Sequence, residues 1–447
     1  MPEIPHAGMN TRPDAAHSSA GPGRFTWDDA VRAALLAILM AAPLAFGAVQ
    51  TWAWTTLLVL GLILFFVWAI SATRHGALRL VWSPLYLPAS AFLLIGLVQY
   101  VGHRTADAFA TREALLNLTC NLVYFFLAGQ LLTAKTPTNV RRWGLATATY
   151  APLLAFFAII QYFSSGGLIY WQVKPRWGGW VFGPYVNHNH YAGLMEMLIP
   201  VGAAYVLTRP KHHPARIPLG TAMTIPVLSL LLSGSRGGLI ALLVEIQVLI
   251  VLVFRAAADS KRRRLATTLV FGLFSVLLLF FALAPGDVLH RLEGLANLSH
   301  SPDVSLGQRL QVAKDSIEIL HAHPLLGTGL GSFSAVYPQY CTFPTDQHWD
   351  HAHNDYAEAL AETGLVGGFL MLWALVLGLR IAFRGLRDRM TREGEWIRIG
   401  AAVGCCGLLV HGLADFNFHI PANALWFAVC LAIATSPSPA VQDEAMK

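Results

Sequence analysis

Residues 350–364, DHAHNDYAEALAETG, gather histidine and carboxylate side chains directly before an apolar run that opens at Leu365. A histidine can take a proton from a hydroxyl group near neutral pH, and a neighbouring carboxylate can hold its ring in place. This combination predicts general base chemistry, with His353 as the base and Asp355 or Glu358 as the group that orients it.

The same stretch also has structural uses. Asp350 or Asn354 can cap a helix that continues through Glu358 and Glu362. Helix capping accounts for these two residues but not for the number of histidines. We therefore expect a helix to begin here and the histidines to have a chemical role.

Metal binding is another interpretation of the histidines. His351 and His353 point about 200° apart on a regular helix, so they cannot both bind one ion there. An extended chain that adds His348 and Asp350 could bind zinc, but the spacing follows no known ligand pattern. We expect no metal and no cofactor, and we expect EDTA to leave the activity intact.

Two arginines are the candidate anion-binding groups. Arg236 lies in SGSRGG, residues 233–238, at a predicted hydrocarbon boundary, where a cation must either meet an anion or snorkel to water. Arg309 follows Gln308 in an outer segment, where a solvated helix face is the alternative. Two guanidinium groups together can bind a phosphate through paired hydrogen bonds.

Two further segments place ionisable side chains at the ends of apolar runs. They are NHNHYAGLMEM at 187–197 and HGLADFNFHIPAN at 411–423. Such residues indicate a functional site unless they pair between helices. We interpret six residues as supporting groups of the site: Asn189, His190, Asn354, Asp355, His411 and Asp415.

The glycines of GTGLG, Gly327, Gly329 and Gly331, imitate a nucleotide-binding loop. No predicted strand precedes them, as a dinucleotide site requires. Tight packing of the backbone is therefore the better interpretation.

The elements that must position these groups are membrane helices. Hydrophobic residues make up 55% of the 447-residue chain, charged residues 13%, and the mean hydropathy is +0.52. These values exclude an ordinary soluble protein and predict an all-α polytopic membrane protein. Because a span needs roughly 20 apolar residues, we expect helices at 30–49, 52–71, 83–101, 115–133, 143–163, 189–207, 217–234, 237–255, 266–285, 364–383, 397–415 and 420–436.

The distribution of positive charge orients these spans. With a cytoplasmic N-terminus and twelve crossings, twenty-three Lys and Arg residues fall inside and eight outside, as the positive-inside rule requires. Both termini are therefore predicted to be cytoplasmic, and the net charge of +6 is no sign of nucleic-acid binding. Cys341 is the one cysteine in the long outer loop, so we expect no disulfide framework.

The predicted organisation has five parts: a disordered cytoplasmic tail at 1–28, nine membrane helices at 29–285, an outer loop at 286–363, three membrane helices at 364–436 and a cytoplasmic tail at 437–447. Loops as long as 286–363 are uncommon and usually functional. The spacing of apolar residues within it predicts an amphipathic helix, with one stripe formed by Leu310, Ala313, Ile317 and Leu320.

Five segments in this order resemble the O-antigen ligase and O-antigen polymerase superfamily of bacterial envelope glycosyltransferases. They are VFGPYVNHNHYAGLMEMLIP, SGSRGGLIALL, GQRLQVAKDSIEILHAHPLLGTGLGSF, HAHNDYAEALAETGLVGG and HGLADFNFHIP. The segments run from residue 181 to residue 421, which is more than half of the chain. They are specific in combination rather than singly.

The resemblance implies a GT-C-like glycosyltransferase of the bacterial inner membrane, with a large periplasmic loop. Ligases of this family move a glycan from undecaprenyl pyrophosphate to a lipid A–core acceptor without a metal. By this resemblance Arg236 and Arg309 bind the pyrophosphate, and His353 activates or positions the acceptor hydroxyl group. Direct attack by that hydroxyl would invert the anomeric carbon.

Three other functions stay open. A polymerase would use a second lipid-linked glycan as acceptor, and a protein oligosaccharyltransferase would use a protein hydroxyl group. A transporter would use His411, Asp415 and Glu196 as a path for protons or substrate. Transporters place their polar groups near the membrane midplane and show related halves, whereas this sequence shows no repeat, so the transferase is the first interpretation.

Overall fold

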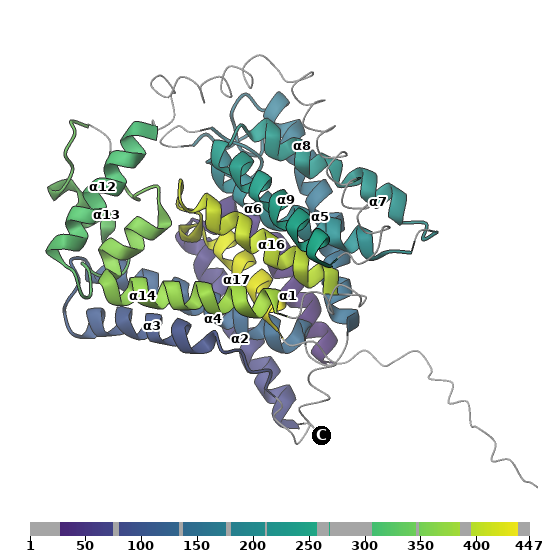
Figure 1. Cartoon of the computed structure of the whole chain (residues 1–447), viewed down its shortest axis with the longest axis horizontal. Coiled ribbons are helices and arrows are strands. Elements are labelled where there is room, and N and C mark those ends of the chain that lie inside the picture. Colours follow the sequence, from purple (N-terminus) through teal and green to yellow (C-terminus); the bar gives the residue numbers. More distant parts are fainter. Residues whose placement is uncertain are drawn as a thin grey trace, which may run out of the picture.

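The protein is a helical bundle in its computed structural model (Figure 1). The structure describes residues 27–74, 80–133, 137–175, 180–210, 212–256, 268, 306–345, 348–384 and 395–436. Within these ranges there is no strand, and two isolated bridges are the only β pairings. The predicted all-α class is confirmed.

The helices follow the predicted apolar runs. Their bounds are α1 Trp27–Leu44, α2 Thr51–Arg74, α3 Tyr86–Val101, α4 Ala108–Leu132, α5 Pro137–Ser164, α6 His188–Thr208, α7 Arg216–Ala222, α8 Thr224–Ser233, α9 Arg236–Ala256, α12 Leu306–Ala322, α13 Phe333–Val336, α14 Asp355–Phe383, α16 Glu395–His411 and α17 Pro421–Thr435. The 3-10 turns are η1 Phe46–Ala48, η2 Tyr337–Gln339 and η3 Asn417–His419. The predicted run 217–234 is divided between α7 and α8.

Six of the described helices are long and apolar enough to span a membrane, namely α2, α4, α5, α6, the α7–α8 pair and α14. The predicted span 266–285 lies outside the described residues apart from residue 268, as do the tail 437–447, nearly all of the tail 1–28, and residues 286–305 of the outer loop. The twelve crossings and the positions of the domain boundaries therefore stay predictions.

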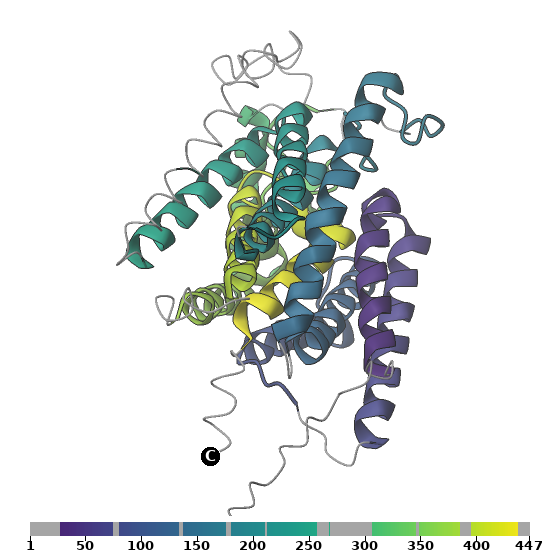
Figure 2. The same ribbon diagram turned by 90° about the vertical axis from the view of Figure 1, so that its right-hand side faces the viewer.

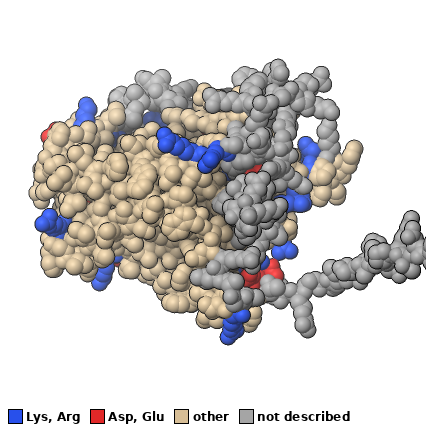
Figure 3. All heavy atoms as spheres, turned by 60° about the horizontal axis from the view of Figure 1, so that its bottom comes forward, with Lys and Arg blue, Asp and Glu red and all other residues tan. Residues whose placement is uncertain are grey.

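Helix α6 forms the centre of the bundle. It packs against α5, α8, α9 and α16, and 78% of its most apolar window is buried (Figure 2). By contrast, α1 and α2 stand side by side along one edge, and only 22% of the corresponding window of α2 is buried. The apolar side chains that α2 leaves exposed, such as Phe66, face outward as lipid-contacting residues do. Figure 3 shows that Lys and Arg lie at the margins of a broad uncharged face.

The outer segment packs against one end of α14, where α12 and α13 lie together (Figure 1). Gly364 interrupts α14 with a φ of +64° and lies against the backbone of Leu325, so the helix changes direction there. Gly327, which has a φ of +68°, lies against the backbone of Glu362, and Gly329 lies against Thr105. The GTGLG segment is therefore a close backbone contact, as predicted.

Helix α12 confirms the predicted amphipathic helix but buries a different face. Leu310 and Ile317 are 55% and 49% exposed, so the predicted stripe is not the buried one. The buried face instead contains Val312, Asp315 and Ile319. Asp315 can be buried because it accepts hydrogen bonds from Gln311, from the hydroxyl groups of Tyr337 and Thr342, and from the backbone N–H of Thr342. The apolar pattern identified the wrong face because it ignores polar groups that are satisfied internally.

Candidate functional site

The polar segments that lie far apart in the sequence meet around one carboxylate, that of Asp415. Its side chain is 1% exposed. Oδ2 lies 3.4 Å from Nη1 of Arg309, and Oδ1 lies 3.6 Å from both Nε2 of His190 and Nδ1 of His353. The structure thus joins the start of α6, the start of α12, the segment before α14 and the turn after α16. We call these four residues the Asp415 cluster.

The charge of Asp415 is balanced by its neighbours. Burial raises the pKa of this carboxyl, but the positive charge of Arg309 and the adjoining rings of His190 and His353 outweigh it and hold the pKa well below its ordinary value. The backbone N–H of Phe416 donates a further hydrogen bond to Oδ1, at 2.9 Å. Asp415 is therefore a buried anion that holds one guanidinium group and two imidazoles in place.

His353 lies in a strained backbone position beside this anion. Its φ is +50°, a left-handed conformation that few residues other than glycine adopt. Such strain persists only where the surroundings fix it, and it occurs often at functional sites. Here the next residue, Asn354, caps α14 by accepting hydrogen bonds from the N–H groups of Tyr356 and Ala357. Of the two caps predicted, Asn354 is therefore the correct one.

Two contacts tie this segment to the turn after α16. The side-chain amide of Asn354 donates to the carbonyl oxygen of Leu413, and the N–H of Asp355 donates to the carbonyl of Gly412. His353 and Asp415 are therefore held at a fixed separation by neighbouring backbone contacts rather than by their own side chains alone.

The group that faces His353 is not the one predicted from sequence. We expected Asp355 or Glu358 to orient the ring, but both carboxylates face His419 instead. On a helix start the side chains of consecutive residues diverge, so the carboxylates nearest in sequence to His353 point elsewhere. Asp415 takes that position, and because it faces Nδ1, the other ring nitrogen, Nε2, is the one that can meet a substrate.

The SGSRGG turn packs against α6 and α16 through its glycines. The left-handed Gly234 ends α8, and the Ser235 hydroxyl accepts a hydrogen bond from the N–H of Gly238 at the start of α9. A Cβ atom on Gly237 would lie 2.6 Å from the ring of His411, and one on Gly238 would lie 2.7 Å from Cβ of Ala192 in α6. Only glycine permits this approach.

Arg236 is half-buried at this turn. Among the described residues, none forms a hydrogen bond or ion pair with its side chain. Gly237, the residue after Arg236, lies against His411, which ends α16 four residues before Asp415.

The remaining supporting residues form the interior of the site. His411 Nδ1 lies 2.7 Å from Oε1 of Glu196, and both side chains are buried. This is the pairing between helices that was the structural alternative for these residues. Asn189 is buried in the first turn of α6, which Asn187 caps.

Phe416 is a residue that the sequence analysis missed. Its ring lies 4.7 Å from that of His190, 4.4 Å from that of His351 and 4.9 Å from that of His353. No feature of residue type separates it from the other phenylalanines of the chain. Its position directly after Asp415 was the available signal.

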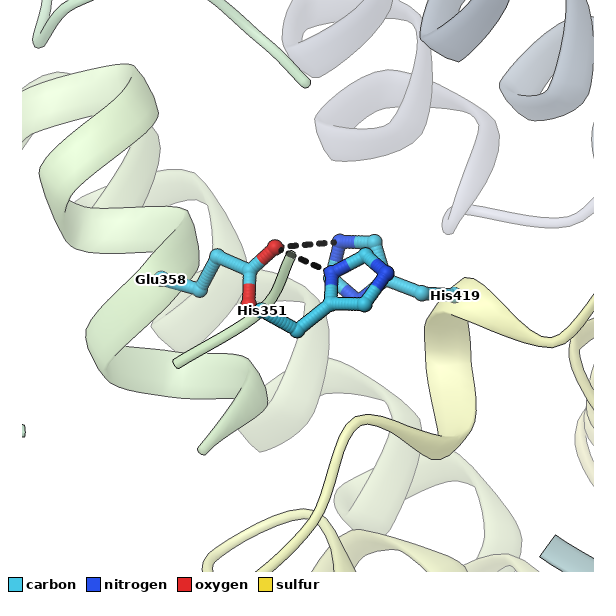
Figure 4. A group of neighbouring side chains, drawn as sticks. All are labelled: His351, Glu358 and His419. Carbon is cyan, nitrogen blue, oxygen red and sulfur yellow. Dashed lines mark hydrogen bonds and ion pairs between the residues drawn. The ribbon is translucent and has the colours of Figure 1, made fainter. Parts of the chain in front are cut away.

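A second group of side chains includes His351, whose ring stacks on that of Phe416, and is drawn in Figure 4. Glu358 projects from α14, with Oε1 at 2.8 Å from Nδ1 of His351 and 3.3 Å from Nε2 of His419. We call these three residues the Glu358 cluster. Asp355 Oδ1 lies 3.1 Å from Nδ1 of His419. Burial lowers the pKa of His419, but the charge of Glu358 and the hydrogen bond and charge of Asp355 outweigh it and raise that pKa to about 10.

Part of the chain matches a known family. Residues 221–372 match the family model described as O-antigen ligase. The match runs from α7 to α14 and includes Arg236, Arg309 and His353. No curated protein matches the sequence.

Proposed function

Because residues 221–372 match the O-antigen ligase family model, we propose that this protein transfers a glycan from undecaprenyl pyrophosphate to the sugar of a lipid A–core acceptor. The observation that carries the proposal is the Asp415 cluster, in which one buried carboxylate faces both a histidine and an arginine. A base and an anion-binding group are the two functions that such a transfer requires.

In the proposed reaction, the acceptor hydroxyl oxygen forms a bond to the anomeric carbon of the donor glycan. Nε2 of His353 takes the hydroxyl proton as the bond between that carbon and the pyrophosphate oxygen breaks. Undecaprenyl pyrophosphate leaves with the bonding electron pair, and attack from the opposite face inverts the anomeric carbon. Asp415 stabilises the imidazolium that forms, as carboxylates do in other histidine-dependent transfers.

The arginines would stabilise the leaving group. Negative charge on the pyrophosphate grows as the bond breaks, and fixed guanidinium groups lower the energy of that state without any divalent ion. Nη1 of Arg309 makes both contacts of this side chain, to Asp415 and to the carbonyl oxygen of Ala414. Its remaining N–H groups have no hydrogen-bond partner within the described ranges and suit a phosphate.

The reaction would take place on the periplasmic side of the bacterial inner membrane, with both termini in the cytoplasm. The charge distribution of the sequence supports this orientation. The lipid tail of the donor requires a site at the membrane boundary, and Arg236 lies at the start of α9, an apolar helix.

The test is transfer by purified protein, given a lipid-linked oligosaccharide with lipid A–core, undecaprenyl-linked glycan and a protein acceptor in competition. Transfer to lipid A–core supports the ligase, whereas transfer only to the second or third acceptor identifies a polymerase or a protein oligosaccharyltransferase. Arg236→Ala, Arg309→Ala and His353→Ala should each reduce transfer by about 100-fold or more while the protein still inserts and folds.

Matched controls are Arg104→Ala and His321→Ala, because both side chains are exposed outside this site. Full activity in any of the three site variants would remove that residue from the mechanism. Substrate-dependent flux in liposomes that survives Arg236→Ala would overturn the transferase in favour of a transporter.

A further inference from the structure

The Glu358 cluster has a geometry that the proposed transfer does not use. Nδ1 of His351, Oε1 of Glu358 and Nε2 of His419 all lie within 4.8 Å of one another. They come from three separate segments, namely the stretch before α14, α14 itself and η3 (Figure 4). We propose that these three atoms bind a divalent transition-metal ion, with Zn²⁺ as the best match.

The ligand set and its spacing support zinc. Two imidazoles and one carboxylate with an open fourth position form a common type of zinc site. Tetrahedral bonds of about 2.0–2.1 Å place ligand atoms about 3.3 Å apart. Oε1 of Glu358 and Nε2 of His419 have this separation, at 3.3 Å, while Nδ1 of His351 is nearer to Oε1, at 2.8 Å. The ligand atoms of His351 and His419 lie within 4.8 Å of each other.

The groups behind the ligands are also those of a metal site. A metal-binding histidine usually donates its other ring N–H to a carboxylate, which fixes the ring and its tautomer. Nδ1 of His419 lies 3.1 Å from Oδ1 of Asp355, so Nε2 is directed at the proposed ion. The second oxygen of Glu358, Oε2, accepts a hydrogen bond from the N–H of Ala352 at 2.8 Å.

An ion can reach this position from solvent. The side chain of Glu358 is 2% exposed, but those of His351 and His419 are 28% and 30% exposed. The buried carboxylate forms the base of the site and the two rings form its rim. A water molecule can therefore complete the coordination.

The ion would act as a clamp between two segments of the candidate active site. His351 lies two residues before His353, and His419 lies four residues after Asp415. An ion bound to both rings and to Glu358 would fix these two segments relative to each other. The proposed ion takes no part in the transfer reaction. It is therefore tested by metal binding and by protein stability, and the result does not depend on the proposed function.

The test is a titration of the full-length protein, purified in detergent without a polyhistidine tag, with Co²⁺. Tetrahedral Co²⁺ has strong visible absorption, so one equivalent per chain should give a band that Zn²⁺ removes by competition. Glu358→Gln, His351→Ala and His419→Ala should each abolish this band. Asp355→Asn should weaken the affinity by about 10–100-fold, because it removes the carboxylate that orients His419.

The matched control is His348→Ala, since this nearby histidine is 67% exposed and faces only Asp350 among the described residues. The control should keep the band. Glu358→Gln keeps the shape of the side chain and an acceptor for the Ala352 N–H. A loss of the band in this variant therefore reports metal binding rather than misfolding. Size-exclusion chromatography and thermal unfolding check that the variant is folded. Absence of the band at equimolar Co²⁺ would overturn the proposal, as would a band that survives Glu358→Gln or that His348→Ala removes.

Discussion

Two carboxylates, Asp415 and Glu358, are both buried and each faces two histidines, and histidines of both groups contact the Phe416 ring. They differ in their third partner. Asp415 also faces the guanidinium group of Arg309, whereas within the described ranges the oxygens of Glu358 contact His351, His419 and the backbone of Ala352. The same residue types thus give one group suited to anions and another suited to a cation.

The difference follows from where each carboxylate lies in the fold. Asp415 lies in the turn where α12 approaches, and α12 brings Arg309. Glu358 lies one turn inside α14, so its neighbours are the segment that enters the helix and the η3 turn opposite. Histidine-rich sequence alone therefore does not define a site, because the third partner decides its chemistry.

The largest difference in transfer rate should be the one between variants of His353 and variants of His351. His353→Ala should reduce glycan transfer by about 10²–10⁴-fold, because it removes the proposed general base. His351→Ala should have a much smaller effect, because that ring faces Glu358 rather than Asp415. Initial rates of transfer by the two purified variants measure this. Equal losses would show that the two clusters act as one site.

Substitution of Arg309 should have the next largest effect on the rate of transfer. Arg309→Ala should reduce kcat for transfer by about 10²–10³-fold, as expected when one group that stabilises a developing charge is lost. Arg309→Lys should recover only part of this activity, because an ammonium group cannot form the paired hydrogen bonds of a guanidinium. Full activity in the lysine variant would mean that a positive charge, rather than this geometry, is sufficient.

The comparison also shows how much the sequence could predict. Apolar runs predicted the helices, because burial in a bilayer requires such runs. His353, Arg309, His190 and Asp415 were all identified by residue type, and the structure brings them together. The partner of His353 was missed because Asp415 is sixty-two positions away in sequence, and only tertiary packing joins them.

The buried face of α12 was missed for a related reason. Leu310 and Ile317 are apolar but exposed, while Asp315 is charged but buried. A hydrophobic pattern cannot reveal that the groups around Asp315 satisfy its carboxylate. The Glu358 cluster was missed because its ligands His351 and His419 are separated by sixty-seven residues, so no short motif contains them.

The low pKa of Asp415 predicts a pH dependence that is specific to this carboxylate. A carboxyl whose pKa is depressed in the folded state stabilises the fold above its unfolded pKa, and this stability is lost as the pH falls through the folded pKa. Wild-type protein should therefore melt at a higher temperature than Asp415→Asn at neutral pH, and the difference should decrease only below about pH 4.

Thermal unfolding of both proteins between neutral and acidic pH measures this difference. The control is Asp350→Asn, because the Asp350 side chain is 76% exposed and lies outside both clusters. Its melting temperature should follow that of the wild type throughout. A constant difference between wild type and Asp415→Asn at every pH would show that Asp415 is not ionised in the folded protein.

The smallest effect on transfer should come from metal removal. EDTA should leave glycan transfer intact, because the proposed mechanism stabilises the leaving group with the guanidinium groups of Arg236 and Arg309 and needs no ion. The same treatment should lower the melting temperature of wild-type protein loaded with Zn²⁺, since a ligand that binds only the folded state stabilises it. Glu358→Gln, which has lost the proposed site, should melt at the same temperature with or without EDTA. Strong inhibition of transfer that Zn²⁺ reverses would contradict the separation of the two clusters and would place the ion in the reaction itself.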